Sequence, residues 1–98
     1  MDQIKPFLNA DMQLTALPAK RRKKLHALYY LSQKLECGKQ YTESEINGAL
    51  GLWHTFHDPA TLRREMYNHC LIGRSRDGKC YWVEEPRPQL ESWIAQYL

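Results

Sequence analysis

The fold is decided by residues 58–83, which read DPATLRREMYNHCLIGRSRDGKCYWV. Asp58 and Pro59 are typical of a helix start, because an aspartate caps free backbone N–H groups and a proline loses no hydrogen bond at the first helical position. Leu62 and Met66 follow at helical spacing and form one apolar face. We therefore expect a helix that begins at Pro59 and buries this face.

Two strand-like runs follow this helix, at residues 71–75 and 80–83. The dipeptide Asp77-Gly78 lies between them. Asp-Gly in this position is a strong hairpin signal, since a type I′ turn needs a positive φ at both of its central residues. The segment therefore predicts a β-hairpin with a type I′ turn.

Upstream, residues 18–35 predict a long amphipathic helix with Pro18 in its first turn. Its buried stripe consists of Leu25, Leu28, Leu31 and Leu35, flanked by Ala27 and Tyr29. Gly38 is expected to close the helix as a left-handed cap. Residues 1–17 have irregularly spaced apolar side chains, and we expect them to form a short extended arm that covers the core.

A second helix is predicted from Thr42 and Glu45, which have the spacing of a capping box. It is expected to be short and to end near Leu52 or Trp53, because two glycines lower its helix propensity. Gln40-Tyr41, just before the helix, suit a very short strand.

The chain has 98 residues and a mass of 11.6 kDa, which suits one domain. Three helices, a minimal strand between the first two and a hairpin directly after the third give the element order of a winged helix-turn-helix. We therefore expect an α+β fold. Residues 1–17 form the arm, residues 18–83 the core and wing, and residues 88–98 an extra C-terminal amphipathic helix.

The net charge of +3 conceals two basic segments, residues 20–24 and residues 63–79. Arginine suits guanine edges and phosphates, and asparagine suits adenine edges. We expect duplex DNA as the partner, contacted through the third helix and the wing. The third helix is expected to expose Arg63, Arg64, Tyr67 and Asn68. The predicted nucleic-acid-binding residues are Lys20, Arg21, Arg22, Lys23, Lys24, Thr61, Arg63, Arg64, Asn68, Arg74, Arg76 and Lys79. For residues 20–24, a solvated helix face remains the alternative.

Four motifs carry a family resemblance: LPAKRRKKL at residues 17–25, GKQYTESEIN at 38–47, ATLRREM at 60–66 and RDGKCYW at 76–82. Together with Phe7-Leu8, they resemble a bacterial family of unknown function that occurs alone and appended to ArsR-like helix-turn-helix transcriptional regulators. The resemblance implies a winged-helix-like domain with a role near transcription. In the fused members the appended helix-turn-helix already supplies DNA binding. An alternative function is therefore a protein–protein interaction or oligomerisation module of a regulator that does not itself bind DNA.

The chain departs from this family where the third helix passes into the first wing strand. The family usually has a glycine there, and this sequence reads His69-Cys70-Leu71-Ile72. A cysteine in a left-handed cap costs about 1 kcal/mol relative to glycine. We therefore expect a remodelled junction.

The C-terminal helix has an apolar stripe that needs a partner surface. The stripe consists of Leu90, Trp93, Ile94, Tyr97 and Leu98. It can dock on its own domain or pair with a second copy across a two-fold axis, as terminal helices of winged-helix regulators commonly do. We favour the homodimer, with a regulator protein as a further possible partner.

The remaining expectations are absences. The sequence has no catalytic motif, so we expect no enzyme, no catalytic residue and no cofactor. His54 and His57 lack cysteines at zinc-ligand spacing, so we expect no metal site. An odd number of cysteines without a CxxC pair suits a reducing compartment. No membrane span or signal peptide is evident, and a cytoplasmic protein is the expectation.

Overall fold

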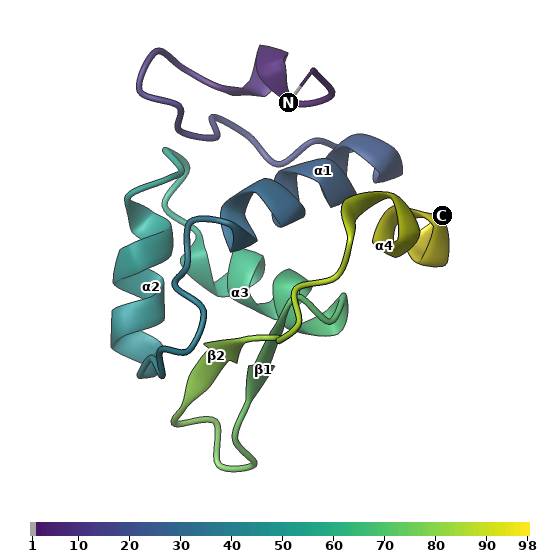
Figure 1. Ribbon diagram of the computed structural model, residues 1–98. Helices are drawn as coiled ribbons and strands as arrows, with labels where there is room; N and C mark the ends of the chain where they lie inside the picture. The colour runs from purple at the N-terminus through teal and green to yellow at the C-terminus, as the bar shows by residue number, and fades with distance from the viewer. Residues whose placement is uncertain (1) are drawn as a thin grey trace.

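The computed structural model describes residues 2–98, and Figure 1 shows their arrangement. This part of the chain has an α+β fold with four α-helices and one antiparallel hairpin, in the predicted order. The elements are a 3₁₀ turn η1 (Lys5–Phe7), α1 (Arg21–Ser32), α2 (Glu43–Gly51), α3 (Pro59–Asn68), β1 (Ile72–Arg74), β2 (Tyr81–Val83) and α4 (Leu90–Tyr97). Within residues 2–98, no helix combines the length and apolar character needed to cross a membrane.

The core lies where α1, α2 and α3 meet, and the hairpin closes one side of it. The predicted leucine stripe of α1 is confirmed, since Leu25, Leu28, Leu31 and Leu35 are all buried. Ile46 and Leu50 of α2 face Leu62 and Met66 of α3 in the same cluster. Burial of these side chains supplies most of the driving force for folding.

The ends of α1 differ from the prediction of residues 18–35. The helix begins at Arg21, because Pro18 is buried ahead of it and Lys20 has an extended backbone. It ends at Ser32 and continues as tighter turns, in which the Leu35 N–H donates to the Ser32 carbonyl. These turns keep Leu35 in the core beyond the helix.

Helices α2 and α3 begin as predicted. The Thr42 hydroxyl accepts from the Glu45 N–H, and the Glu45 carboxylate accepts from the Thr42 N–H. Asp58 caps α3 by accepting from the Thr61 N–H. The expected strand at residues 40–41 is reduced to one bridge between Tyr41 and Tyr81.

The predicted hairpin is confirmed, with Ile72 opposite Val83 and Arg74 opposite Tyr81. The predicted turn type is wrong. Only Gly78 has a positive φ in the turn, and its N–H donates to the Ser75 carbonyl. Asp77 keeps an ordinary φ because its carboxylate accepts from the Ser75 hydroxyl and the Lys79 N–H.

The junction between α3 and β1 is not remodelled, contrary to the expectation. Cys70 adopts the left-handed conformation at φ 61°. The Leu71 N–H donates to the Met66 carbonyl, and the Cys70 N–H donates to the Tyr67 carbonyl. These two bonds and the buried Leu71–Met66 pair define a Schellman cap, with cysteine in the position that glycine usually occupies.

The N-terminal arm covers the core but is not extended. Met1 of the predicted arm lies outside the described residues. The rest contains η1 and folds back on itself, with a bridge between Leu8 and Leu14. Ile4 and Leu14 are buried, and the Tyr30 hydroxyl donates to the Met12 carbonyl.

Helix α4 docks on its own chain, beside the start of α1 (Figure 1). Trp93 and Ile94 are buried, and the Trp93 indole N–H donates to the His69 carbonyl. Of the stripe predicted for dimerisation, Leu90 and Tyr97 are half-buried and Leu98 is exposed. The fold therefore already covers two of the side chains that a dimer would share, and dimerisation stays a prediction.

Candidate nucleic-acid interface

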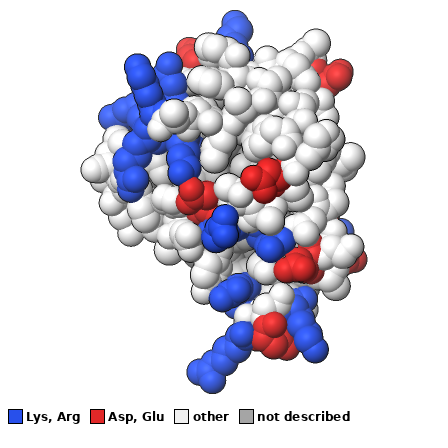
Figure 2. Space-filling view, turned by 180° about the vertical axis from the view of Figure 1, so that it is seen from behind, with Lys and Arg blue, Asp and Glu red and all other residues white. Residues whose placement is uncertain are grey.

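The two basic segments lie on one face of the molecule. Figure 2 shows Lys and Arg side chains gathered around the start of α1, across α3 and out to the tip of the hairpin. The contact between the first two regions is direct, because Lys24 of α1 forms an ion pair with Glu65 of α3. Segments that are far apart in the sequence thus form one basic face, which we define as the predicted residues of α1, α3 and the hairpin.

Acidic side chains on this face are engaged within the fold. Glu65 is held by Lys24, and its second oxygen lies 3.7 Å from His69 Nδ1. The hydrogen bond from Lys24 lowers the pKa of Glu65. In the hairpin turn, hydrogen bonds from the Ser75 hydroxyl and the Lys79 N–H lower the pKa of Asp77. Both carboxylates are therefore ionised and internally satisfied at neutral pH.

Arg63 does not lie on the exposed side of α3, and this part of the prediction is wrong. Its guanidinium donates to the Asn47 side chain and lies 3.4 Å from Glu43, both on α2. It also lies 5.4 Å from the centre of the Tyr81 ring, and its side chain is only 16% exposed. Arg63 therefore ties α3 to α2 and the hairpin.

Two further predicted residues are committed to internal contacts. The Arg21 side chain donates to the Tyr97 carbonyl, which fixes the end of α4 against the start of α1. Thr61 is half-buried in the first turn of α3. Arg21, Lys24 and Arg63 therefore contribute less free charge to the face than the other predicted cations.

The remaining predicted cations are available to a ligand. Seven of them form no ion pair with any residue in the range 2–98: Lys20, Arg22, Lys23, Arg64, Arg74, Arg76 and Lys79. Arg64 is exposed in the middle of α3, and Arg76 and Lys79 are exposed at the hairpin tip. Asn68 is exposed one helical turn after Arg64.

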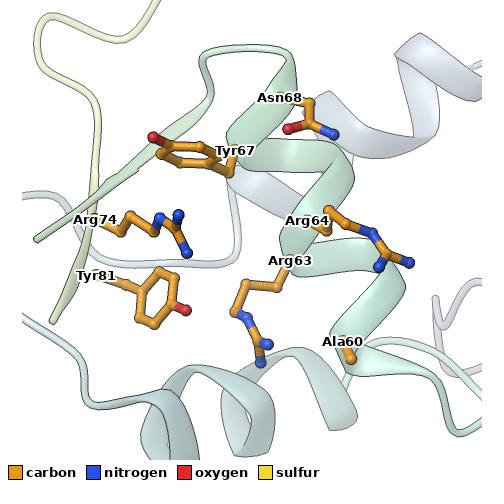
Figure 3. Close-up of a pocket in the computed structure, with 7 residues that line it drawn as sticks. All are labelled: Ala60, Arg63, Arg64, Tyr67, Asn68, Arg74 and Tyr81. Carbon is orange, nitrogen blue, oxygen red and sulfur yellow. The ribbon is translucent and has the colours of Figure 1, made fainter. Parts of the chain in front are cut away.

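A pocket of about 310 Å³ lies between α3 and the hairpin (Figure 3). Its lining consists of Ala60, Arg63, Arg64, Tyr67, Asn68, Arg74 and Tyr81. In Figure 3, Arg74 reaches from the hairpin toward α3 between the rings of Tyr67 and Tyr81, and Arg64 extends on the other side of the helix. The Arg74 guanidinium lies 4.9 Å from the centre of the Tyr67 ring, at cation–π distance. Its contact with the Tyr67 hydroxyl raises the pKa of Arg74.

Sequence reasoning missed the two tyrosines and Asn47 as parts of this site. The hairpin register contained a signal for Tyr81, which stands directly opposite Arg74. Tyr67 follows Arg63 by four residues and was recognised only as a residue on the outer face of the helix. Asn47 had no local signal, because its contact with Arg63 depends on how α2 packs against α3.

No group of three His, Cys, Asp or Glu side chains in residues 2–98 is arranged to hold a metal ion. His54 is instead a buried structural residue. Its Nδ1 lies 2.8 Å from the Leu50 carbonyl, and its Nε2 accepts from the Asp58 N–H.

A family model described as an uncharacterized protein conserved in bacteria matches residues 13–83. The match covers α1, α2, α3 and the hairpin, and therefore the whole of the basic face. The start of the arm and α4 lie outside it. No curated protein and no solved structure matches the chain.

Proposed function

The chain belongs to the bacterial family DUF2087, and we propose that it binds double-stranded DNA as a winged helix-turn-helix. In this proposal α2 and α3 form the helix-turn-helix, α3 faces the major groove, and the hairpin is the wing beside the phosphate backbone. The start of α1 adds phosphate contacts at one end of the site. The protein then acts as a transcriptional regulator or accessory factor.

The observation that carries the proposal is the single basic face. Separate basic patches would be consistent with a solubility role, whereas one face that runs over α1, α3 and the hairpin tip matches the order in which a winged helix meets DNA (Figure 2). The pairing of Glu65 on this face supports the same conclusion. Glu65 would repel a phosphate if it were free, but Lys24 compensates its charge.

Arg64 and Asn68 are the residues that we assign to base-edge contacts. Both are exposed on α3, at positions i and i+4 of one helix face. Arg76 and Lys79 are assigned to phosphates, because they lie at the hairpin tip. Phosphate contacts position a protein on DNA, and base contacts select the sequence.

A salt series on duplex DNA tests the proposal. Each neutralised phosphate contributes about −0.9 to the slope of log affinity against log salt concentration, so seven free cations predict a slope of about −6. The variant that combines Arg64→Ala, Arg76→Ala and Lys79→Ala should lose affinity and reduce the slope by about 3. Fluorescence anisotropy with a labelled random duplex measures both quantities.

Lys39→Ala is the control for loss of a charge outside the basic face. Lys39 lines a different hollow, beside Glu84 and Glu85, so its removal changes the net charge without touching the basic face. Its slope should equal that of the unmodified protein. If the protein is not retained on DNA at low salt, or if the triple variant binds as well as the unmodified chain, the proposal is wrong. A protein–protein interaction module then becomes the better hypothesis.

A further inference from the structure

The pocket between α3 and the hairpin has an unusual lining for a surface hollow. Its side chains are three arginines, two tyrosines, one asparagine and one alanine, with no carboxylate among them. Every charged group in the lining is therefore positive, and guanidinium groups donate hydrogen bonds but accept none. Such a lining selects an anion with several acceptor oxygens.

Arg74 is the cation that the hairpin contributes to the pocket, and it is free to bind a ligand. It forms no ion pair with any residue in the range 2–98, whereas Glu43 partly compensates Arg63. The ring of Tyr67 orients its guanidinium, and the Arg74 side chain is exposed to solvent. The Arg74 guanidinium is therefore held in place before a ligand arrives, which lowers the entropy cost of binding.

The Arg74 guanidinium covers one face of the Tyr67 ring, so the ring offers its remaining surface next to this cation. The Tyr67 side chain is 41% exposed although it lies between α3 and the hairpin. An exposed aromatic ring beside an arginine suits a ligand that joins a flat ring to a phosphate, because rings stack on tyrosine and phosphates pair with guanidinium groups. The volume of about 310 Å³ is at the lower end of the range for small-molecule sites, about 300 to 1,000 Å³.

We propose that this pocket binds one nucleotide unit, with its phosphate on Arg74 and its ring against Tyr67. The unit belongs either to a DNA strand or to a free nucleotide. This proposal rests on the proposed DNA binding only if the nucleotide belongs to a DNA strand. The recognition chemistry is the same in both cases.

Titration with AMP, adenosine and inorganic phosphate tests the pocket directly. The binding is followed through the arginine side-chain N–H signals by NMR, which detects weak complexes. AMP should bind about tenfold more tightly than adenosine, since a charge-assisted hydrogen bond contributes at least this factor. Arg74→Gln should abolish the difference between AMP and adenosine, and Arg74→Lys should retain only part of it.

Arg76→Gln is the matched control, because it removes the same charge from the same hairpin outside the pocket lining. It should retain the preference for AMP. Tyr67→Ala should weaken AMP and adenosine together and leave inorganic phosphate unchanged. Equal binding of AMP and adenosine to the unmodified protein, or an unchanged preference in Arg74→Gln, would overturn the proposal.

Competition separates the two sources of the phosphate. If AMP displaces a labelled duplex, the pocket holds a nucleotide of the DNA strand. If AMP and the duplex bind together, the ligand is a free nucleotide. If the protein binds DNA but does not prefer AMP over adenosine, the pocket proposal is wrong and the proposed function stands. If the protein binds AMP but not DNA, the proposed function is wrong and the pocket proposal stands.

Discussion

The ammonium group of Lys24 on α1 forms an ion pair with the carboxylate of Glu65 on α3. The two side chains are 31% and 22% exposed, so the pair is partly shielded from water. His69 approaches the same carboxylate from the end of α3. The contact joins the two basic segments and compensates the charge of Glu65 within the face.

Glu65→Gln should lower the free energy of unfolding by about 1 kcal/mol at neutral pH. The hydrogen bond from Lys24 lowers the pKa of Glu65 below its ordinary value of 4.5. A lowered pKa in the folded state means that the stabilisation is complete above the ordinary pKa and is lost as the pH falls through the lowered value. Urea denaturation at a series of pH values should therefore show the difference between the two proteins disappearing in acid.

The same substitution should strengthen DNA binding, because it removes a negative charge from the basic face and releases Lys24. We expect a gain of about two- to fivefold at low salt. Glu36→Gln, which changes an exposed carboxylate beyond the other end of α1 that forms no ion pair in residues 2–98, is the control and should alter neither property. Weaker DNA binding by Glu65→Gln would show that Glu65 does not oppose the ligand.

Cys70→Gly should stabilise the protein by about 0.5 to 1 kcal/mol. Cys70 has a φ of 61° in the Schellman cap of α3, a conformation that costs free energy for a residue with a Cβ atom. Cys70→Ala is the control, since it removes the thiol and its contact with Tyr97 but retains the Cβ. Thermal and urea unfolding should show a gain for glycine and none for alanine. Equal stability of the two variants would mean that the cap is not strained.

His54→Phe should destabilise the protein by about 2 kcal/mol or more. The imidazole is buried and connects the end of α2 to the start of α3 through the Leu50 carbonyl and the Asp58 N–H. Phenylalanine fills the volume but leaves the Asp58 N–H without a partner, and the Leu50 carbonyl keeps its bond from the Trp53 N–H. Chemical denaturation measures the loss, with Thr55→Ala as an exposed neighbouring control.

The bonds of His54 also define its tautomer. Nε2 accepts a hydrogen bond from the Asp58 N–H, so the ring proton of the neutral form must lie on Nδ1. Nitrogen NMR of the imidazole should identify Nδ1 as the protonated atom at neutral pH. A proton on Nε2 would contradict this arrangement.

The sequence predicted the features that depend on neighbouring residues. The capping box of Thr42 and Glu45 and the aspartate cap of α3 each need only four consecutive residues, and both are present. The hairpin was also predictable, but its turn type was not, because a type I′ turn and the observed turn both place a glycine at position 78. The side-chain bonds of Asp77 decide between them.

The features that the sequence did not predict depend on packing between distant segments. Helical spacing placed Arg63 on the outer face of α3, but α2 lies close enough for Asn47 and Glu43 to bind it. The stripe on α4 allowed Trp93 to meet either its own domain or a second copy, and the second copy was favoured. In the structure the indole finds a hydrogen-bond partner in His69 of the same chain.

Substitution by alanine should therefore reduce stability at Arg63 but not at Arg64. Arg63→Ala removes a side chain that is hydrogen-bonded to α2, so it should cost about 1 to 2 kcal/mol of stability. Arg64→Ala removes an exposed side chain without an ion pair in residues 2–98, so its effect on stability should lie within about 0.5 kcal/mol. Urea denaturation measures both, and each variant is the charge-matched control of the other.

DNA affinity should show the reverse order. Arg64→Ala should weaken binding by about tenfold if its guanidinium forms a bidentate base contact, and Arg63→Ala should weaken it less at temperatures where both variants are folded. The order follows from the geometry, because only the arginine that is free of internal partners can exchange solvent for DNA without breaking a bond inside the protein. An Arg63→Ala variant that is stable but no longer binds DNA would contradict this prediction. It would show that Arg63 contacts DNA and that its bonds to α2 contribute little to stability.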